Sequence, residues 1–406
     1  CQSAGCVYFS DHAGQNSFIF CAKTMYDLKI YSSYIVAAIK DKIVFFSTDG
    51  AVLHTITVEQ KAPVKDTDAG NEPNGNQTQP TPANVVTFEY CPTAKVLAVS
   101  LSDKTWRRYQ LREEDGGKLC SAPLGEDITT ARTIVSMKFV PKHGVLFGTD
   151  KSDCFEFGAL DKTSEPQPKW ILGHMSQILA LAVSDDERFI VTSDRDEKIK
   201  VSSYPDCHNI ECFCLGHTEY VGGIEIIPSE KLISVSGDRT LRLWDVTEGK
   251  ELSKLSLKEP ALDFTVQKVA EGCGMLCAVR SYVQNMVEVA LVSYDKPDAS
   301  ELYDPLTIDE SLIILNAGLS ASLRLMLLTM EKESKRVRML VYEFCAEKRA
   351  FKACDDHPFV KNFEDQFKDV TIEQVRDYST LFKHTIDNLT EYFERKKIKM
   401  ESKKSK

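Results

Sequence analysis

The sequence predicts an all-β protein, a seven-bladed WD40 β-propeller with a C-terminal amphipathic helix. Three observations support this fold class. One segment carries the complete motif of a WD40 repeat, and a second segment repeats most of that motif one period earlier. Near the C-terminus, a stretch without glycine or proline has the apolar spacing of a helix. A single blade cannot bury both of its faces, so one good repeat indicates a closed ring of them.

The complete repeat begins at Gly216-His217 and ends at Trp244-Asp245. We expect His217 in the loop that enters the inner strand, and Asp238 in the turn between the second and third strands. A serine on the second strand, Ser234 or Ser236, and the indole N–H of Trp244 then complete a hydrogen-bonded chain, because buried polar groups need partners. His217, Asp238 and Trp244 are therefore predicted to form a structural tetrad with that serine and to have no catalytic role.

The second repeat begins at Gly173-His174, one WD40 period upstream. Its closing Trp-Asp is replaced by Ser202-Ser203, so this blade lacks the indole of the tetrad but keeps a histidine and an aspartate. We interpret Asp196 as the tetrad-type acid. Arg195 and Glu197 flank it in an exposed turn, where the fold does not require them.

The other blades are predicted from alternating apolar residues and turn signals rather than from a motif. Together with the two repeats they give seven blades within residues 26–350, although a count of six or eight stays open. The segments are Leu28–Ile56, Val85–Tyr109, Ile134–Phe157, Leu262–Tyr294 and Leu306–Tyr342.

The segments outside the repeats have different compositions. Residues 1–25 contain short apolar runs, and one of them could close the ring by pairing with the last blade. Residues 61–83 are polar and rich in Pro, Gly and Asn, which predicts a flexible loop between blades. Residues 371–399 are predicted to form the C-terminal helix, and residues 395–406 form a basic tail. Two interpretations of this end remain open: a helix packed on the propeller, or an appendage that contacts a partner or RNA.

Composition narrows the functional classes. The net charge of −10 argues against a protein that coats nucleic acid by bulk electrostatics, so any RNA contact must come from a local basic patch. The chain has thirteen cysteines without zinc-binding spacing, and no signal peptide is recognisable. We expect reduced thiols and a nuclear location, with the cytoplasm as a second compartment. Enzyme motifs and metal-binding motifs are not recognisable either, which favours a binding subunit.

Two segments resemble one particular family. Ser184–Val201 and Ile210–Val221 closely resemble the non-catalytic WD-repeat subunit of tRNA (guanine-N7)-methyltransferase, the Wuho family. The run Asp194-Arg-Asp-Glu-Lys-Ile199 is specific, because ordinary WD repeats have Asp-Gly-Thr or a similar turn there. Leu381–Phe393 looks like the terminal helix of that family. The first two blades and residues 1–25 match it poorly.

The resemblance implies a function. In this family the propeller binds and stabilises a separate S-adenosylmethionine-dependent catalytic subunit, and the pair methylates N7 of a guanine in the variable loop of certain tRNAs. The resemblance assigns partner contact to Arg195, Glu197 and Lys200, and RNA contact to Arg132 and Lys151. It also implies a heterodimer that helps to hold tRNA, in which this chain itself carries no cofactor and no metal.

The alternative is a general WD40 scaffold for protein interactions, such as a ubiquitin-ligase adaptor or a chromatin or repair platform. The fold does not separate the two, because propellers serve many functions. The turn at 194–200 and the basic C-terminus favour the tRNA-modification subunit, whereas the acidic net charge favours the scaffold.

Overall fold

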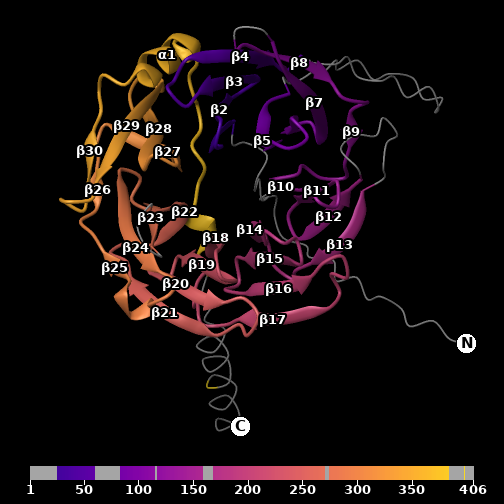
Figure 1. Ribbon diagram of the computed structural model, residues 1–406, viewed down its shortest axis with the longest axis vertical. Helices are drawn as coiled ribbons and strands as arrows, with labels where there is room; N and C mark the ends of the chain where they lie inside the picture. Colours follow the sequence, from indigo (N-terminus) through magenta and orange to yellow (C-terminus); the bar gives the residue numbers. More distant parts are fainter. Residues whose placement is uncertain are drawn as a thin grey trace, which may run out of the picture.

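A computed structural model shows seven antiparallel sheets arranged as a ring around a central axis (Figure 1). It describes residues 25–59, 83–114, 117–158, 168–269, 274–383 and Lys397. The predicted fold class, a seven-bladed WD40 propeller, is confirmed. None of the helices described is long and apolar enough to cross a membrane.

Each blade is built from strands that are consecutive in the sequence. Blades 1 to 3 contain β1 (Tyr26–Ile30), β2 (Tyr34–Ile39), β3 (Lys42–Ser47) and β4 (Val52–Thr57); β5 (Val85–Cys91), β6 (Val96–Leu101), β7 (Thr105–Glu113), β8 (Leu119–Pro123) and the short β9 (Ile128–Thr129); and β10 (Ser136–Val140), β11 (Val145–Thr149), β12 (Asp153–Phe157) and β13 (Lys169–Gly173).

Blades 4 and 5 contain β14 (Ile178–Val183), β15 (Phe189–Asp194), β16 (Ile199–Ser203) and β17 (Ile210–Cys214); and β18 (Val221–Ile227), β19 (Lys231–Ser236), β20 (Thr240–Asp245) and β21 (Glu251–Ser256). Blades 6 and 7 contain β22 (Ala261–Lys268), β23 (Gly274–Ser281), β24 (Met286–Ser293), β25 (Glu301–Leu302) and β26 (Leu306–Thr307), with the 3-10 turn η1 (Pro297–Ala299); and β27 (Leu312–Leu319), β28 (Arg324–Glu331), β29 (Val337–Cys345) and β30 (Ala350–Ala353).

The hydrophobic core lies between the sheets. Because each blade packs against two neighbours, its middle strands are buried on both faces and read as continuous apolar runs, as in β6, where every residue is buried. One such layer joins Val191 and Val201 of blade 4 to Ile224 and Trp244 of blade 5. The antiparallel order places two sets of loops on one face of the ring, which we call the upper face: the turns between second and third strands, and the connections between blades.

The ring closes through the C-terminal helix of the predicted fold class, which lies earlier in the chain than the predicted residues 371–399. All four strands of the last blade come from residues 312–353, and the strand expected within residues 1–25 lies outside the described residues, apart from residue 25. Helix α1 (Pro358–Phe367) follows β30 directly. Proline occupies its first position, and the His357 side chain accepts a hydrogen bond from the Phe359 backbone N–H at 3.2 Å. Figure 1 shows α1 at the junction of the last and first blades.

Helix α1 binds both blades. Its Phe359, Phe363 and Phe367 are buried in a cluster that contains residues of β1 to β3 and β27 to β29. Polar contacts flank this cluster: the Lys42 Nζ donates to the Gln366 carbonyl at 2.6 Å, and Arg338 Nη1 lies 2.8 Å from Glu364 Oε1. The helix therefore holds blade 1 against blade 7 with side chains, without a shared strand.

The helix expected over residues 371–399 is wrong for its first part. Residues 371–383 are extended, apart from the 3-10 turn η2 (Ser379–Leu381) and a bridge between Thr371 and Arg336. The apolar side chains of this segment bind different surfaces: Val375 packs on the cluster at α1, whereas Tyr378 packs in another cluster near Tyr220. A helix would place them on one side. Residues 384–396 and 398–406 lie outside the described residues, as do residues 61–82 of the predicted loop.

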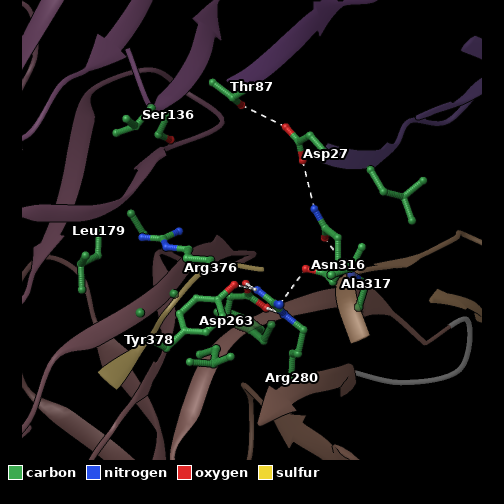
Figure 2. A pocket seen from close by; sticks show the side chains of 18 of the residues that line it. Asp27, Thr87, Ser136, Leu179, Asp263, Arg280, Asn316, Ala317, Arg376 and Tyr378 are labelled. Carbon is green, nitrogen blue, oxygen red and sulfur yellow. Dashed lines mark hydrogen bonds and ion pairs between the residues drawn. The ribbon is translucent and has the colours of Figure 1, made fainter. Parts of the chain in front are cut away.

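The extended segment covers the upper mouth of a central cavity of about 360 Å³ (Figure 2). The innermost strands of all seven blades line this cavity, and Arg376, Tyr378 and Leu381 of the segment line its mouth. Buried Arg280 links the two, because its Nη2 donates to the Tyr378 hydroxyl at 3.2 Å and its Nε donates to Asp263 at 2.9 Å. The chain after α1 is thus fixed across the ring, as Figure 1 shows.

Candidate partner-docking and RNA-contacting surface

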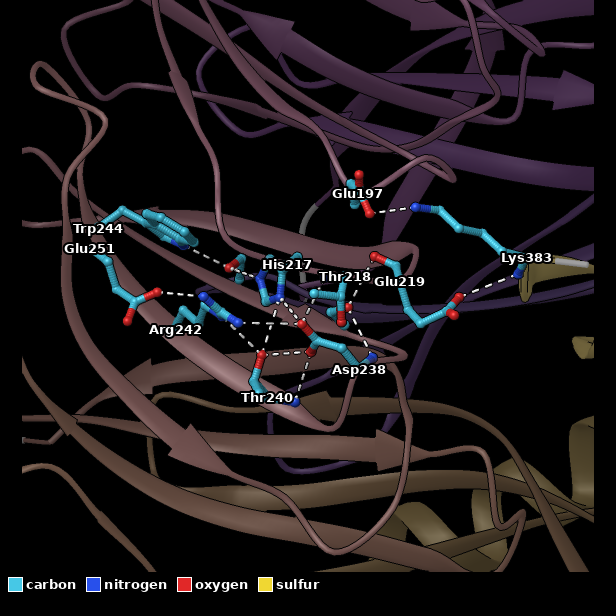
Figure 3. A network of polar contacts seen from close by, with 12 residues as sticks. Glu197, His217, Thr218, Glu219, Asp238, Thr240, Arg242, Trp244, Glu251 and Lys383 are labelled. Atoms are coloured by element: carbon cyan, nitrogen blue, oxygen red, sulfur yellow. Dashed lines mark hydrogen bonds and ion pairs between the residues drawn. The ribbon is translucent and has the colours of Figure 1, made fainter. Parts of the chain in front are cut away.

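Blade 5 contains the predicted polar chain (Figure 3). The His217 Nδ1 lies 3.0 Å from Asp238 Oδ2, and its Nε2 lies 2.7 Å from Ser234 Oγ. The Trp244 indole N–H donates to the same Ser234 oxygen at 2.8 Å. Ser234 is therefore the serine of the tetrad, and Ser236 instead accepts from the Asp238 backbone N–H at 3.1 Å.

The pKa shifts of the hydrogen-bonded side chains in blade 5 are those of a structural network. Burial alone would raise the pKa of Asp238, but the hydrogen bonds that it accepts from His217, Thr240 and the Thr218 backbone hold that pKa well below its ordinary value. Burial lowers the pKa of His217, which favours the neutral ring. A neutral imidazole can donate to the carboxylate and accept from the Ser234 hydroxyl. Every side chain of this hydrogen-bonded network therefore has a partner.

Blade 4 uses a different aspartate from the predicted one. The His174 Nδ1 lies 2.9 Å from Asp194 Oδ2, and its Nε2 lies 2.7 Å from Thr192 Oγ1. Asp194 also accepts from the backbone N–H groups of Asp196 and Lys198, at 2.9 Å each. The interpretation of Asp196 as the tetrad-type acid is therefore wrong: Asp194 ends β15, close to His174, and leaves Asp196 half-exposed in the turn.

The three predicted partner-contacting residues differ in exposure. Arg195 and Glu197 lie half-exposed in the turn between β15 and β16 on the upper face, and Arg195 Nε is 3.7 Å from Asp196 Oδ1. Lys200 is only 7% exposed, and its Nζ donates to the Gly173 carbonyl at 2.6 Å. Burial lowers its pKa. Arg195 and Glu197 can meet a partner directly, whereas Lys200 can act only by holding blade 4 against β13.

Glu197 occupies an unusual backbone position. Its φ is +71°, in the left-handed region that glycine adopts most easily. Four other turns between second and third strands hold a non-glycine residue at positive φ, and each of these residues is basic: Lys40, Lys104, Arg239 and Lys335. Among these five described turns, Glu197 is thus the single acid.

The sequence did not predict that the C-terminal segment contacts this turn. The Lys383 Nζ pairs with the Glu197 carboxylate, and the Lys383 backbone N–H lies 3.3 Å from Glu219 Oε2 (Figure 3). The two residues are far apart in the sequence, and the predicted helix gave no register that would bring them together.

Exposed apolar side chains concentrate on the outer strands of blades 3 and 4. Of the nine large apolar residues exposed in the described part of the chain, five lie on or just after the outer strands β13 and β17. We call these five the apolar rim: Trp170, Met175, Ile210, Phe213 and Leu215. Cys214 pairs with Ile199, so Leu215 follows the strand end next to the turn of Glu197. Exposed aromatic and Met side chains are enriched at interaction sites.

The two predicted RNA-contacting residues lie on the upper face of blade 3. Arg132 is exposed, and its Nη1 lies 3.5 Å from Asp150 Oδ2 and 4.0 Å from Asp153 Oδ2. Lys151 is exposed in the following turn and has no ion-pair partner among the described residues. Asp150 therefore neutralises Arg132 in part, whereas the charge of Lys151 is available.

This chain is similar to known proteins over most of its length. A family model described as the WD40 domain of the tRNA methyltransferase TRM82 matches residues 158–335, which include the apolar rim and the turn of Glu197. A protein of Aedes aegypti named tRNA (guanine-N(7)-)-methyltransferase non-catalytic subunit wuho is 32% identical over 91% of this chain and 96% of its own length. The proteins of that name from Culex quinquefasciatus and Drosophila melanogaster are 33% and 28% identical, over 82% and 79% of this chain and 79% and 76% of their own lengths.

Among solved structures, a chain in a crystal structure of the mitotic checkpoint complex superposes with a TM-score of 0.57. It covers 82% of this chain and 95% of that one at 12% identity, and this likeness concerns the fold alone.

Proposed function

Because this chain belongs to the family of non-catalytic WD-repeat subunits of tRNA (guanine-N7)-methyltransferase, we propose that it docks and stabilises a separate catalytic subunit through the upper rim of blade 4. In this proposal the partner binds S-adenosylmethionine and methylates N7 of a guanine in the variable loop of tRNA. The propeller forms a heterodimer with it and helps to hold the tRNA.

One combination of features carries the proposal: the acidic turn of Glu197 in blade 4 and the apolar rim on the outer strands of blades 3 and 4. Stable interfaces have an apolar core enriched in aromatic and Met side chains, with charged groups that orient the partner at its edge. The rim supplies Trp170, Phe213 and Met175, and Glu197 and Arg195 supply charges of both signs in the turn of blade 4. A glycine would fit the backbone of Glu197 better, and the four equivalent positions hold basic residues, so the acidic side chain distinguishes this turn from the others.

Substituting Glu197 by glycine is expected to weaken binding of the catalytic subunit without unfolding the propeller. Glycine relieves the left-handed backbone but loses more chain entropy, and these effects offset each other to within about 1 kcal/mol. Truncating one member of an interfacial charge pair costs about 2–5 kcal/mol, a loss of roughly 30-fold or more in affinity. The measurement is co-purification with the catalytic subunit, followed by a guanine-N7 methylation assay on tRNA.

Arg239→Gly is the matched control, because Arg239 occupies the equivalent left-handed position in blade 5, with a φ of +62°. It should keep both binding and methylation. If wild-type protein does not bind the catalytic subunit, or if both glycine variants bind as wild type does, the proposed docking surface is wrong.

We propose in addition that Lys151 and Arg132 contact the tRNA backbone. Lys151→Glu is expected to raise the KM for tRNA and to reduce the slope of log affinity against log salt by about one, because one phosphate contact is lost. Affinity for the catalytic subunit should not change. The control is Lys118→Glu, an exposed lysine before β8 on the opposite face. Equal effects of the two substitutions would argue against a specific tRNA contact.

A further inference from the structure

The C-terminal segment reaches the proposed docking surface from a firm anchor. The Phe382 ring packs edge-on against Tyr220 and Tyr282, with centroid distances of 5.2 and 5.3 Å. Leu381, one residue earlier, is buried in the cluster that contains Tyr220. These contacts fix the residue that follows, Lys383, beside blades 4 and 5.

The contact that Lys383 makes beyond this anchor is weak by comparison. The side chains of Lys383 and Glu197 are 38% and 39% exposed, so water and salt screen their ion pair. The Lys383 backbone N–H lies 3.3 Å from Glu219 Oε2, a long hydrogen bond. An exposed pair of this kind can be exchanged for another cation without disturbing the aromatic anchor.

Glu197 therefore already holds a basic side chain from its own chain. A catalytic subunit that uses Glu197 must either replace that lysine or bind around it. Replacement is favoured by the geometry, because Lys383 lies over the carboxylate on the exposed upper face (Figure 3). A partner cation that pairs with Glu197 would also meet the like charge of Lys383 at short range.

We propose that Lys383 and a Lys or Arg side chain of the catalytic subunit bind Glu197 in mutual exclusion, so that docking displaces Lys383. This inference rests on the proposed function, in which Glu197 contacts the partner. Its consequence is that the chain competes with its own partner, and the observed affinity is lower than the surface could give.

The first test is the affinity of the full-length chain for the catalytic subunit, measured by calorimetry. Removing the competing cation with Lys383→Gln should tighten binding about two- to five-fold, the equivalent of ~0.5–1 kcal/mol for an exposed pair. Lys368→Gln, an exposed lysine directly after α1, is the control and should leave the affinity unchanged. In the Glu197→Gly background, Lys383→Gln should have no further effect, as a double-mutant cycle requires.

A second readout is zero-length amine-to-carboxylate cross-linking with a carbodiimide. We expect a Lys383–Glu197 cross-link in the free subunit and its loss in the complex. Persistence of the cross-link in the complex, or weaker binding by Lys383→Gln, would overturn the exchange. If Glu197→Gly binds as wild type does, the proposed docking surface fails instead. If Glu197→Gly loses binding while Lys383→Gln binds as wild type does, only the exchange fails.

Discussion

Replacing Asp238 with alanine is expected to lower the free energy of unfolding by about 3–5 kcal/mol, because it leaves a buried network without its acceptor. Asp238 accepts from His217 and from the Thr218 and Thr240 backbone N–H groups, at 3.0 to 3.1 Å, while its side chain is 5% exposed. Arg242 Nη2 is 3.5 Å away. The substitution removes the carboxylate that all four of these groups contact. Chemical denaturation at neutral pH measures the loss.

Asp196→Ala is the control for this substitution. Asp196 follows a histidine-containing loop and stands in the turn after the second strand, as Asp238 does, but in blade 4 the histidine pairs with Asp194. Its loss should cost less than about 0.5 kcal/mol. If Asp238→Ala were no more destabilising than Asp196→Ala, the polar chain of blade 5 would not contribute to stability.

Acidic pH should reduce the difference in unfolding free energy between wild type and Asp238→Ala. The pKa of Asp238 is lowered by folding, so its contribution is fully present above the ordinary carboxyl pKa of about 3.9 and is lost as the pH falls through the folded value. The variant has no such contribution to lose. The difference in unfolding free energy should therefore be nearly the same at pH 7 and pH 4 and should begin to shrink between pH 4 and pH 3. A difference that stays constant down to pH 3 would contradict the lowered pKa.

Replacing Phe363 with alanine is expected to cost about 3–5 kcal/mol and to open the ring between its first and last blades. The Phe363 side chain is fully buried, with ring centroids 6.4 Å from Phe46 of blade 1 and 4.8 Å from Phe367. The cavity left behind lies at the junction that α1 closes. Hydrogen exchange should therefore accelerate first in β2 and β3, and thermal unfolding should occur at lower temperature.

Lys361→Ala, at an exposed position of the same helix, should change stability by less than about 0.5 kcal/mol. Exchange that accelerates equally in all seven blades of Phe363→Ala would show general destabilisation rather than an opened junction, and would contradict the closing role of α1.

The blades were predictable because their signal is repeated. Gly216-His217 and Trp244 identify one blade, and alternation with turn residues finds the others. The position of helix α1 was missed although phenylalanines recur at every fourth position after a proline, since ten residues give too few turns for a reliable period. The opposite error occurred after residue 371, where apolar spacing suited a helix but Val375 and Phe382 bind different parts of the ring.

The candidate site was predictable in its position but not in its contacts. The exposed turn that holds Arg195 and Glu197 could be located from the repeat pattern. The burial of Lys200 depends on how β16 packs beside the end of β13, and the pairing of Glu197 with Lys383 depends on a path across the whole ring. The apolar rim escaped notice because its members lie on two outer strands, which a reading of single repeats does not bring together.

The position of α1 after the last blade also shapes how the molecule can be made. Every sheet is continuous in the sequence, so each blade can form as soon as its own strands leave the ribosome. The helix that joins the two ends emerges only afterwards. Until blade 7 and α1 have both emerged, Phe46 and the rest of the apolar edge of blade 1 lack part of their cover. During translation the blades therefore form an unclosed ring with exposed apolar surface. A pause or an early stop before α1 leaves the nascent chain in that aggregation-prone form.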